Sequence, residues 1–310
     1  MINRELIRLK AVQIVYAYYE NEGKTVETAE KEFFFSLTKA YDLYGQMLLL
    51  MLGINQIATR SVETQQAKSN RLGLGTTVST KFVQNRFIAQ LEQNEHLRQF
   101  RDNQKFSWLD EEDFLRRVYS RIQQEECYMD YMESESSTYE EDRELWRKLY
   151  RTILCNNEEL DGLLEDMSLY WNDDKVIVDT FVLKTIKRFE EANGSKQELL
   201  PEFNSEDDRE FASNLFRNAI LNAEYYQSLV SEQTRHWDLN RIARMDLVIL
   251  QLGLAEIISF PGIPLSVSIN EYVEIAKAYS TPRSGSYVNG VLDALGKRLL
   301  DENKLIGKKL

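Results

Sequence analysis

The position of the prolines is the strongest constraint on how this chain can fold. The sequence has four prolines, and all of them lie between Pro201 and Pro282. Because proline fixes φ and removes a backbone donor, the first 200 residues lack the residue that most strongly interrupts a helix. Apolar residues also recur at helical spacing along most of the chain, as they do at Leu6, Leu9, Val12 and Tyr16. We therefore predict an all-α protein.

Three polar segments separate the predicted helices. Residues 69–80 are rich in Gly, Ser and Thr, and residues 133–141 are acidic and rich in Ser. Residues 193–208 combine Asn-Gly-Ser, Pro201 and an acidic run, which makes them the strongest linker signal. A chain of 310 residues has room for about two domains.

An internal repeat spans this linker. The sequence EDREL at 141–145 is echoed by DDREF at 207–211, and Trp171 matches Trp237 at the same offset of 66 residues. When the alignment is shifted by one residue after the tryptophan, residues 141–185 as a whole resemble residues 207–252. Any two amphipathic helices are similar, but matching Arg, Asn (Asn156 with Asn222) and Trp at one offset favours a duplication. The first copy is then predicted to be a helical scaffold.

Composition limits the possible functions. The formal net charge is −12, which is the wrong sign for non-specific binding of nucleic acid or anionic lipid. Two cysteines and two histidines make a disulfide scaffold, a metal site or a histidine-based catalytic dyad improbable. We expect no metal and no cofactor. The N-terminus has no cationic segment followed by a long apolar run, and no apolar stretch is long enough to cross a bilayer, so we expect a cytoplasmic protein without a membrane partner.

The C-terminal third carries the most specific motifs. Residues 237–250 read WDLNRIARMDLVIL, residues 263–277 read IPLSVSINEYVEIAK, and residues 287–293 read YVNGVLD. Together with AVQIVY at 11–16, these motifs resemble the NusB family of bacterial transcription antitermination factors in order and spacing. The segment from about 25 to about 205 has no counterpart in the short members of that family.

The resemblance implies two small helical bundles and a division of the chain. Residues 1–24 would form the first helix of the NusB-like core, 25–192 an inserted helical region, 193–206 a linker, 207–300 the C-terminal bundle and 301–310 a tail. The implied function is non-catalytic. It consists of binding the boxA element of nascent ribosomal RNA transcripts jointly with the ribosomal protein NusE, in the elongation complex of RNA polymerase.

The resemblance also places an RNA contact near the N-terminus. Single-stranded RNA is usually held by basic side chains on its phosphates and by aromatic side chains stacked on its bases. Arg4 and Arg8 match two of the family's N-terminal arginines, and their (i, i+4) spacing puts them on one helix face. Lys10 adds a further charge, while Glu5 and Leu6 replace two positions that are usually basic. The alternative for Arg4 and Arg8 is a solvated helix end.

Further candidates come from later motifs. Tyr16 matches a family tyrosine that would border the RNA face. Tyr287 matches a family aromatic and is a candidate for stacking on bases, with a half-buried core position as the alternative. Arg283 adds positive charge in a loop where other members often carry an acid. Asp246 keeps an acidic position that would lie near the NusE contact. Gln251 replaces a usual arginine, which affects the inner packing or the partner surface.

The same motifs have structural interpretations. Residues 261–264, with two prolines and a glycine, are predicted to end one helix and turn the chain. Ser268, followed three residues later by Glu271, fits a capping box at the start of the next helix. Gly290 predicts a close approach between helices.

Charge is distributed unevenly along the chain. Residues 1–24 and 231–310 each carry a net charge of +1, so the residues between them carry −14. Within that acidic middle, residues 60–91 hold five basic side chains and one acid. Two interpretations of this segment stay open, a second RNA-facing patch or, the favoured one, a basic face that pairs with the acidic stretch after Asp110.

Two other functions compete with RNA binding. A protein-binding scaffold that has lost RNA binding fits Glu5, Leu6 and the acidic middle. A remnant of an rRNA methyltransferase, an enzyme class that can carry a NusB-like domain, would need a glycine-rich cofactor loop after a strand and a catalytic cysteine. The only short glycine pair, Gly73 and Gly75, follows no strand of substance, and Cys127 and Cys155 lie in helical context, so we discount the enzyme.

Overall fold

The computed structural model describes residues 1–310 except 22–23, 76, 172, 235–241, 306 and 309–310. Within this described part every regular element is helical, apart from one isolated bridge between Ile2 and Phe203. The all-α prediction is confirmed. Contacts divide the chain into two compact units, which we call the terminal unit (residues 2–38 and 202–310) and the insert unit (Met1 and residues 39–201).

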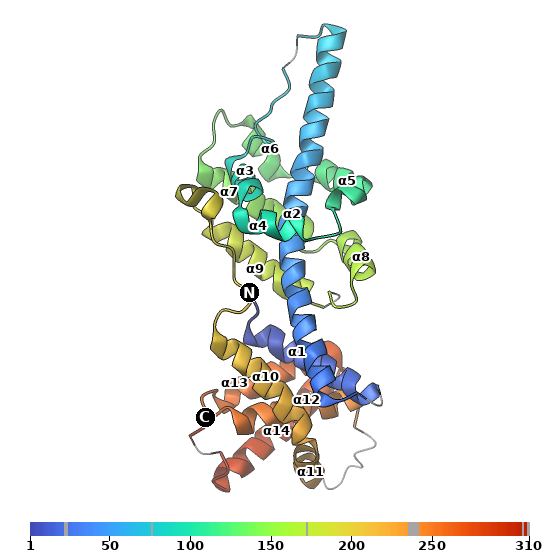
Figure 1. Cartoon of the computed structure of the whole chain (residues 1–310), viewed down its shortest axis with the longest axis vertical. Helices are drawn as coiled ribbons and strands as arrows, with labels where there is room; N and C mark the ends of the chain where they lie inside the picture. Colours follow the sequence, from blue (N-terminus) through green and yellow to red (C-terminus); the bar gives the residue numbers. More distant parts are fainter. Residues whose placement is uncertain (22–23, 76, 172, 235–241, 306, 309–310) are drawn as a thin grey trace. The chain divides into compact units, whose positions relative to one another are not determined.

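The terminal unit combines the two ends of the sequence (Figure 1). Its helices are α1 (Arg4–Glu20), the first part of α2 (Val26–Leu72), α10 (Glu206–Leu221), α11 (Ala223–Gln233), α12 (Arg244–Ser259), α13 (Leu265–Tyr279) and α14 (Ser284–Asp301). Helix α12 packs against α1, α10, α11, α13 and α14. Every residue of α12 from Val248 to Ile257 is buried, as expected for a helix at the centre of a bundle.

The start of α2 belongs to this unit because it packs on α10. The rings of Phe33 and Phe216 are stacked with their centroids 4.8 Å apart, and Arg217 forms an ion pair with Glu30. The compact unit therefore extends to Thr38, whereas the predicted insertion begins at residue 25. The turn predicted at residues 261–264 lies between the end of α12 and the start of α13.

The insert unit contains the rest of α2 and a set of shorter helices. These are α3 (Arg86–Gln93), α4 (Glu95–Asp102), α5 (Glu112–Ile122), α6 (Glu126–Glu133), α7 (Tyr139–Leu149), α8 (Glu158–Met167) and α9 (Lys175–Arg188), with 3₁₀ turns η1 (Trp108–Glu111) and η3 (Glu191–Lys196) and a π-helical turn η2 (Tyr150–Leu154). Its core includes an aromatic cluster in which the Phe82 ring contacts Tyr119, Tyr128 and Trp146. No helix in the described residues combines the length and apolarity that a membrane span requires.

Both units contain the same polar arrangement at one helix start. In the terminal unit Asn3 caps α1 and the next residue, Arg4, pairs with Asp208 at 3.2 Å. In the insert unit Asn85 caps α3 and the next residue, Arg86, pairs with Asp142 at 3.3 Å. Asp142 and Asp208 are equivalent positions of the predicted repeat. Duplication itself stays a prediction, because the partner of Trp171, Trp237, lies outside the described residues.

Close helix approach in the terminal unit depends on a different glycine from the one predicted. A Cβ built on Gly290 meets no atom within 4 Å, so the interpretation of Gly290 as a contact glycine is wrong. A Cβ on Gly253 of α12 would lie 2.9 Å from Cδ1 of Leu292, whose side chain is fully buried on α14. Gly253 therefore permits α12 and α14 to approach each other.

This contrast gives a stability prediction with a built-in control. Gly253→Ala should lower the free energy of unfolding by about 1–3 kcal/mol, because the added methyl overpacks a buried contact. Gly290→Ala should raise it by up to about 1 kcal/mol through helix propensity alone. Urea denaturation measures both, and equal effects of the two substitutions would contradict the packing described for α12 and α14.

Candidate RNA and partner interface

Backbone and side-chain contacts fix the start of α1. The Ile2 amide donates to the Glu202 carbonyl at 2.7 Å, next to the bridge between Ile2 and Phe203. The Asn3 side chain accepts from the Leu6 amide at 2.9 Å, which satisfies a donor that the first helical turn leaves unpaired. These contacts position the two turns that carry the candidate arginines.

Arg8 is buried among carboxylates. Its Nε and Nη2 atoms donate to the two oxygens of Glu256 at 2.7 and 2.9 Å, and Nη1 donates to Glu271 at 3.1 Å. The Arg8 side chain is 5% exposed and the Glu256 side chain is not exposed at all. Glu256 also accepts from the hydroxyls of Ser268 at 2.8 Å and Tyr272 at 3.1 Å. This network joins α1, α12 and α13.

The protonation states follow from these contacts. Burial alone would lower the pKa of the Arg8 guanidinium, but the hydrogen bond and negative charge of Glu256 outweigh burial and raise it. Burial, followed by the charge of Glu256, holds the pKa of Tyr272 well above its ordinary value, so the phenol keeps the proton it donates. A bidentate, fully hydrogen-bonded pair is the geometry that best offsets the cost of burying two charges.

Ser268 and Glu271 belong to this network, and the predicted capping box is wrong. Helix α13 begins at Leu265 with Pro264 at the N-cap, so Ser268 lies inside the helix and is buried. Proline is tolerated at a helix start because the amide it lacks would have had no partner there. The helix therefore begins one turn earlier than the sequence pattern predicts, and Ser268 donates to Glu256 instead of capping.

Arg4 has a different environment from Arg8, although the two share a helix face. Both guanidinium groups lie over the Phe211 ring, at 4.9 and 5.5 Å from its centroid. The Arg4 side chain pairs with Asp208 yet remains 42% exposed. A phosphate contact by Arg8 would require its guanidinium to leave two carboxylates. Lys10 is also buried, at 2% exposure.

A second group of candidate residues meets at the start of α14. Asp246 is buried and accepts a hydrogen bond from the Ser284 hydroxyl at 2.9 Å. Ser284 follows the exposed Arg283 and begins the helix that carries the half-buried Tyr287. Burial, and then the nearby charge of Asp246, raise the pKa of Tyr287. Asp246 thus anchors the turn that displays Arg283. Tyr16 on α1 is half-buried.

The replacement of the usual arginine by Gln251 leaves no gap in the hydrogen bonding. The buried Gln251 amide donates to the Tyr19 hydroxyl at 2.8 Å and to the Ala219 carbonyl at 2.7 Å. Its oxygen accepts from Gln227 at 3.1 Å. One side chain therefore connects α1, α10, α11 and α12.

Glu256 is the site residue that the sequence motifs did not identify. It is the single acid in the otherwise apolar run from Leu252 to Ile258. An ionised carboxylate buried on such a helix needs a charged and hydrogen-bonding partner. That signal points to an internal cation, but the sequence does not say which basic residue supplies it.

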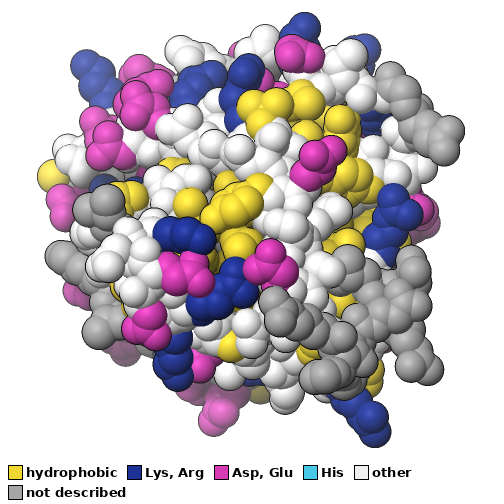
Figure 2. Space-filling view, turned by 90° about the horizontal axis from the view of Figure 1, so that it is seen from below, with side chains coloured by type: hydrophobic (Ala, Val, Ile, Leu, Met, Phe, Trp, Pro, Cys, Tyr) yellow, Lys and Arg dark blue, Asp and Glu magenta, His cyan; other side chains and the backbone are white. Residues whose placement is uncertain are grey.

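Exposed charge is mixed. Figure 2 shows one face of the molecule, on which basic, acidic and hydrophobic side chains are interspersed. Among the described side chains of this face, the mixture of signs gives no continuous cationic field, which a tight electrostatic RNA site would require.

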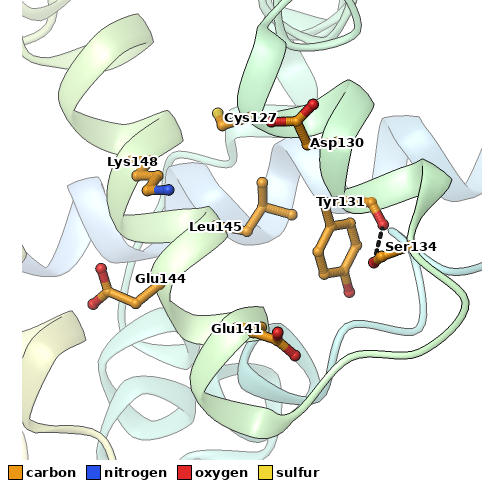
Figure 3. Close-up of a pocket in the computed structure, with 8 residues that line it drawn as sticks. All are labelled: Cys127, Asp130, Tyr131, Ser134, Glu141, Glu144, Leu145 and Lys148. Carbon is orange, nitrogen blue, oxygen red and sulfur yellow. Dashed lines mark hydrogen bonds between the residues drawn. The ribbon is translucent and has the colours of Figure 1, made fainter.

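A pocket in the insert unit has the chemistry of neither an RNA site nor a thiol nucleophile. Figure 3 shows this cavity of about 280 Å³, in which Lys148 is accompanied by Asp130, Glu141 and Glu144. Burial raises the pKa of Cys127, which also lines the pocket, and raises the pKa of Cys155 to about 11. Both groups are therefore thiols at neutral pH, whereas a nucleophilic cysteine needs the thiolate.

The buried pair gives the second stability prediction. Arg8→Met should lower the free energy of unfolding by about 3–5 kcal/mol, because Glu256 is left charged and buried without its partner. Arg4→Met removes a partly exposed pair and should cost less than about 1 kcal/mol. Urea denaturation measures both changes. A loss of unfolding free energy at position 8 as small as that at position 4 would show that the network does not stabilise the fold.

Part of the chain is similar to known proteins. The family model described as the NusB family matches residues 179–297. The transcription antitermination protein NusB of Salinibacter ruber is 35% identical over 130 residues, which cover 40% of this chain and 81% of that protein. The one from Geotalea daltonii is 34% identical over 136 residues, or 44% and 90%. A solved structure of T. maritima NusB is 31% identical with a TM-score of 0.31, covering 40% of this chain and 87% of that chain. The identity to the Salinibacter ruber and Geotalea daltonii proteins, which extends over most of their length, shows that the chain belongs to the NusB family.

Proposed function

We propose that this protein is a non-catalytic, cytoplasmic antitermination factor. It binds boxA-type RNA of nascent ribosomal RNA transcripts together with the ribosomal protein NusE, within the elongation complex of RNA polymerase. The observation that supports this most is the 35% identity to a transcription antitermination protein over 81% of that relative's length. The compact terminal unit gathers residues 2–38 and 202–310 into one helical body.

The candidate residues divide into two roles in this proposal. Arg4 and Arg283 expose their guanidinium groups and contact phosphates, while the half-buried Tyr16 and Tyr287 present ring edges or faces to bases. Arg8 lies beneath this surface and holds α1 in place without contacting phosphate, because its charge is neutralised by Glu256 and Glu271.

Lys10 and Asp246 also contribute as buried residues and not through direct contact with RNA or NusE. Lys10 is buried on α1, and Asp246 is buried at the base of the turn that carries Arg283. Asp246 influences the NusE contact by holding the start of α14 rather than by offering a free carboxylate. Because the family-like segments 1–24 and 231–310 each carry a net charge of only +1, tight RNA binding requires NusE to supply the remaining contacts.

Fluorescence titration of boxA RNA with the full chain and NusE tests the proposal. The pair should bind more tightly than NusE alone. Arg4→Ala and Arg283→Ala should each reduce the slope of log affinity against log salt by about 0.7, the value for one phosphate contact on a single strand. Lys297→Ala, which removes an exposed cation from the same helix as Tyr287, serves as the matched control and should leave the slope unchanged.

Two outcomes oppose the proposal. If the pair binds RNA no more tightly than NusE alone, the chain is the scaffold that has lost RNA binding. If all three substitutions change the slope equally, general charge and not a defined site accounts for binding.

A further inference from the structure

The last turns of α2 form an exposed helical segment in the insert unit. We call residues 60–72 the basic arm. It carries Arg60, Lys68 and Arg71 against the single acid Glu63, in a chain whose net charge is −12. In Figure 1 this part of α2 extends beyond the shorter helices of its own unit. Of residues 63–72, all but Gln66 and Ser69 are exposed.

One face of the arm is covered by the chain that follows it. The amide of Val78 donates to the side-chain oxygen of Gln66 at 2.8 Å, and Ser69 is buried. The returning segment therefore lies on the face formed by Gln66 and Ser69.

The two cations near the tip lie on the opposite face. Each residue of an α-helix advances by about 100°, so a side chain two positions away points to nearly the opposite side. Lys68 is two residues after Gln66, and Arg71 is two residues after Ser69. Lys68 and Arg71 are one turn apart on the same face, and both are exposed.

Some basic residues of the insert unit are paired with acids, whereas others, such as Lys184 and Lys187 on α9, are exposed and form no ion pair among the described residues. Arg86, Arg117 and Arg147 each pair with a carboxylate, and at the base of the arm Arg60 lies 3.2 Å from Glu112. The Arg60 pair agrees with the predicted pairing to the acidic stretch after Asp110. Lys68 and Arg71 form no ion pair with any acid in the described part of the chain.

We propose that the basic arm is a second RNA-binding site, which holds phosphates of the transcript outside the short boxA element. The inference rests on the proposed function and extends it to the insert unit. The arm has no aromatic residue to stack on bases, so its contribution is electrostatic and independent of base sequence. Thr64, one turn before Lys68, adds a polar group on the same face.

The composition of the arm favours RNA over a protein partner. Protein interfaces have a core that is depleted of charge and enriched in apolar and aromatic side chains. The exposed large apolar residues here are Leu72 and, just beyond the arm, Leu74, and neither lies between the cations in sequence. Two exposed cations one turn apart on a polar helix fit neighbouring phosphates.

The test uses the full chain with NusE and two RNAs, the boxA element alone and the same element extended on both sides by unstructured sequence. Lys68→Gln with Arg71→Gln keeps helix propensity and removes both charges. The matched control is Lys184→Gln with Lys187→Gln, an exposed (i, i+3) pair on α9 that removes the same charge from the same unit.

The wild-type complex should bind the extended RNA more tightly than the short one. The arm variant should lose that advantage and reduce the salt slope for the extended RNA by about 1.4, or two phosphate contacts, while binding the short RNA normally. The α9 control should behave as the wild type, and changing the sequence of the extensions should not matter.

Several results would overturn the inference. These are an equal affinity of the wild type for both RNAs, an equal loss in the α9 control, or an arm variant that binds RNA normally but binds an acidic protein partner less well. Failure of the proposed function is distinguishable from all of these, because the short RNA alone would then go unbound while the arm still governs binding of the extended RNA.

Discussion

The terminal unit depends on the ion pair between Arg8 and Glu256. The two residues are 248 positions apart in sequence, and their bidentate contact is almost completely shielded from water. Glu271, Ser268 and Tyr272 add further hydrogen bonds to the pair, so the network links the first helix to two helices near the other end of the chain. It defines how α1 lies against α12 and α13 and therefore where Arg4 is displayed.

This interaction also explains how a family core accommodates a long insertion. The insert unit, residues 39–201, separates the two halves of the terminal unit in sequence. The entropy cost of closing a chain grows only slowly with its length, so a folded insertion adds little to the cost of bringing the halves together. The contacts of Phe33 on Phe216 and of Glu30 on Arg217 then hold the start of α2 within the terminal unit.

The sequence predicts the helical class and the family from local patterns, because periodicity, proline positions and motif order are local properties. It predicts less about which charges face solvent. Arg4 and Arg8 are alike in sequence and share a face, yet one is 42% exposed and the other is buried, since Glu256 comes from a helix remote in sequence. The start of α13 is predicted wrongly for a related reason. Serine often caps a helix, but in the fold the Ser268 hydroxyl donates to Glu256. The motif around Gly290 is typical of a glycine at a helix contact, but it is Gly253 at which a Cβ would meet a neighbouring side chain, that of Leu292.

The acidic and the basic side chains have different roles in the molecule. The acidic excess lies mainly outside the family-like ends, and many of its carboxylates are used in ion pairs on the surface of the insert unit. We infer that a small number of the solvent-facing cations act at defined places, Arg4 and Arg283 on the terminal unit and Lys68 with Arg71 on the basic arm. In this account Arg8 is part of the fold and not part of the RNA contact.

The most direct test is the salt dependence of RNA binding when the Arg8 charge is removed without leaving a buried charge behind. Arg8→Met combined with Glu256→Gln neutralises both partners, while the glutamine oxygen still accepts from one of the two hydroxyls, Ser268 or Tyr272, and the amide group donates toward the other. The account predicts that this double variant, with NusE, binds boxA RNA with the wild-type slope of log affinity against log salt. A slope reduced by about 0.7 would show that Arg8 contacts a phosphate and would contradict the account.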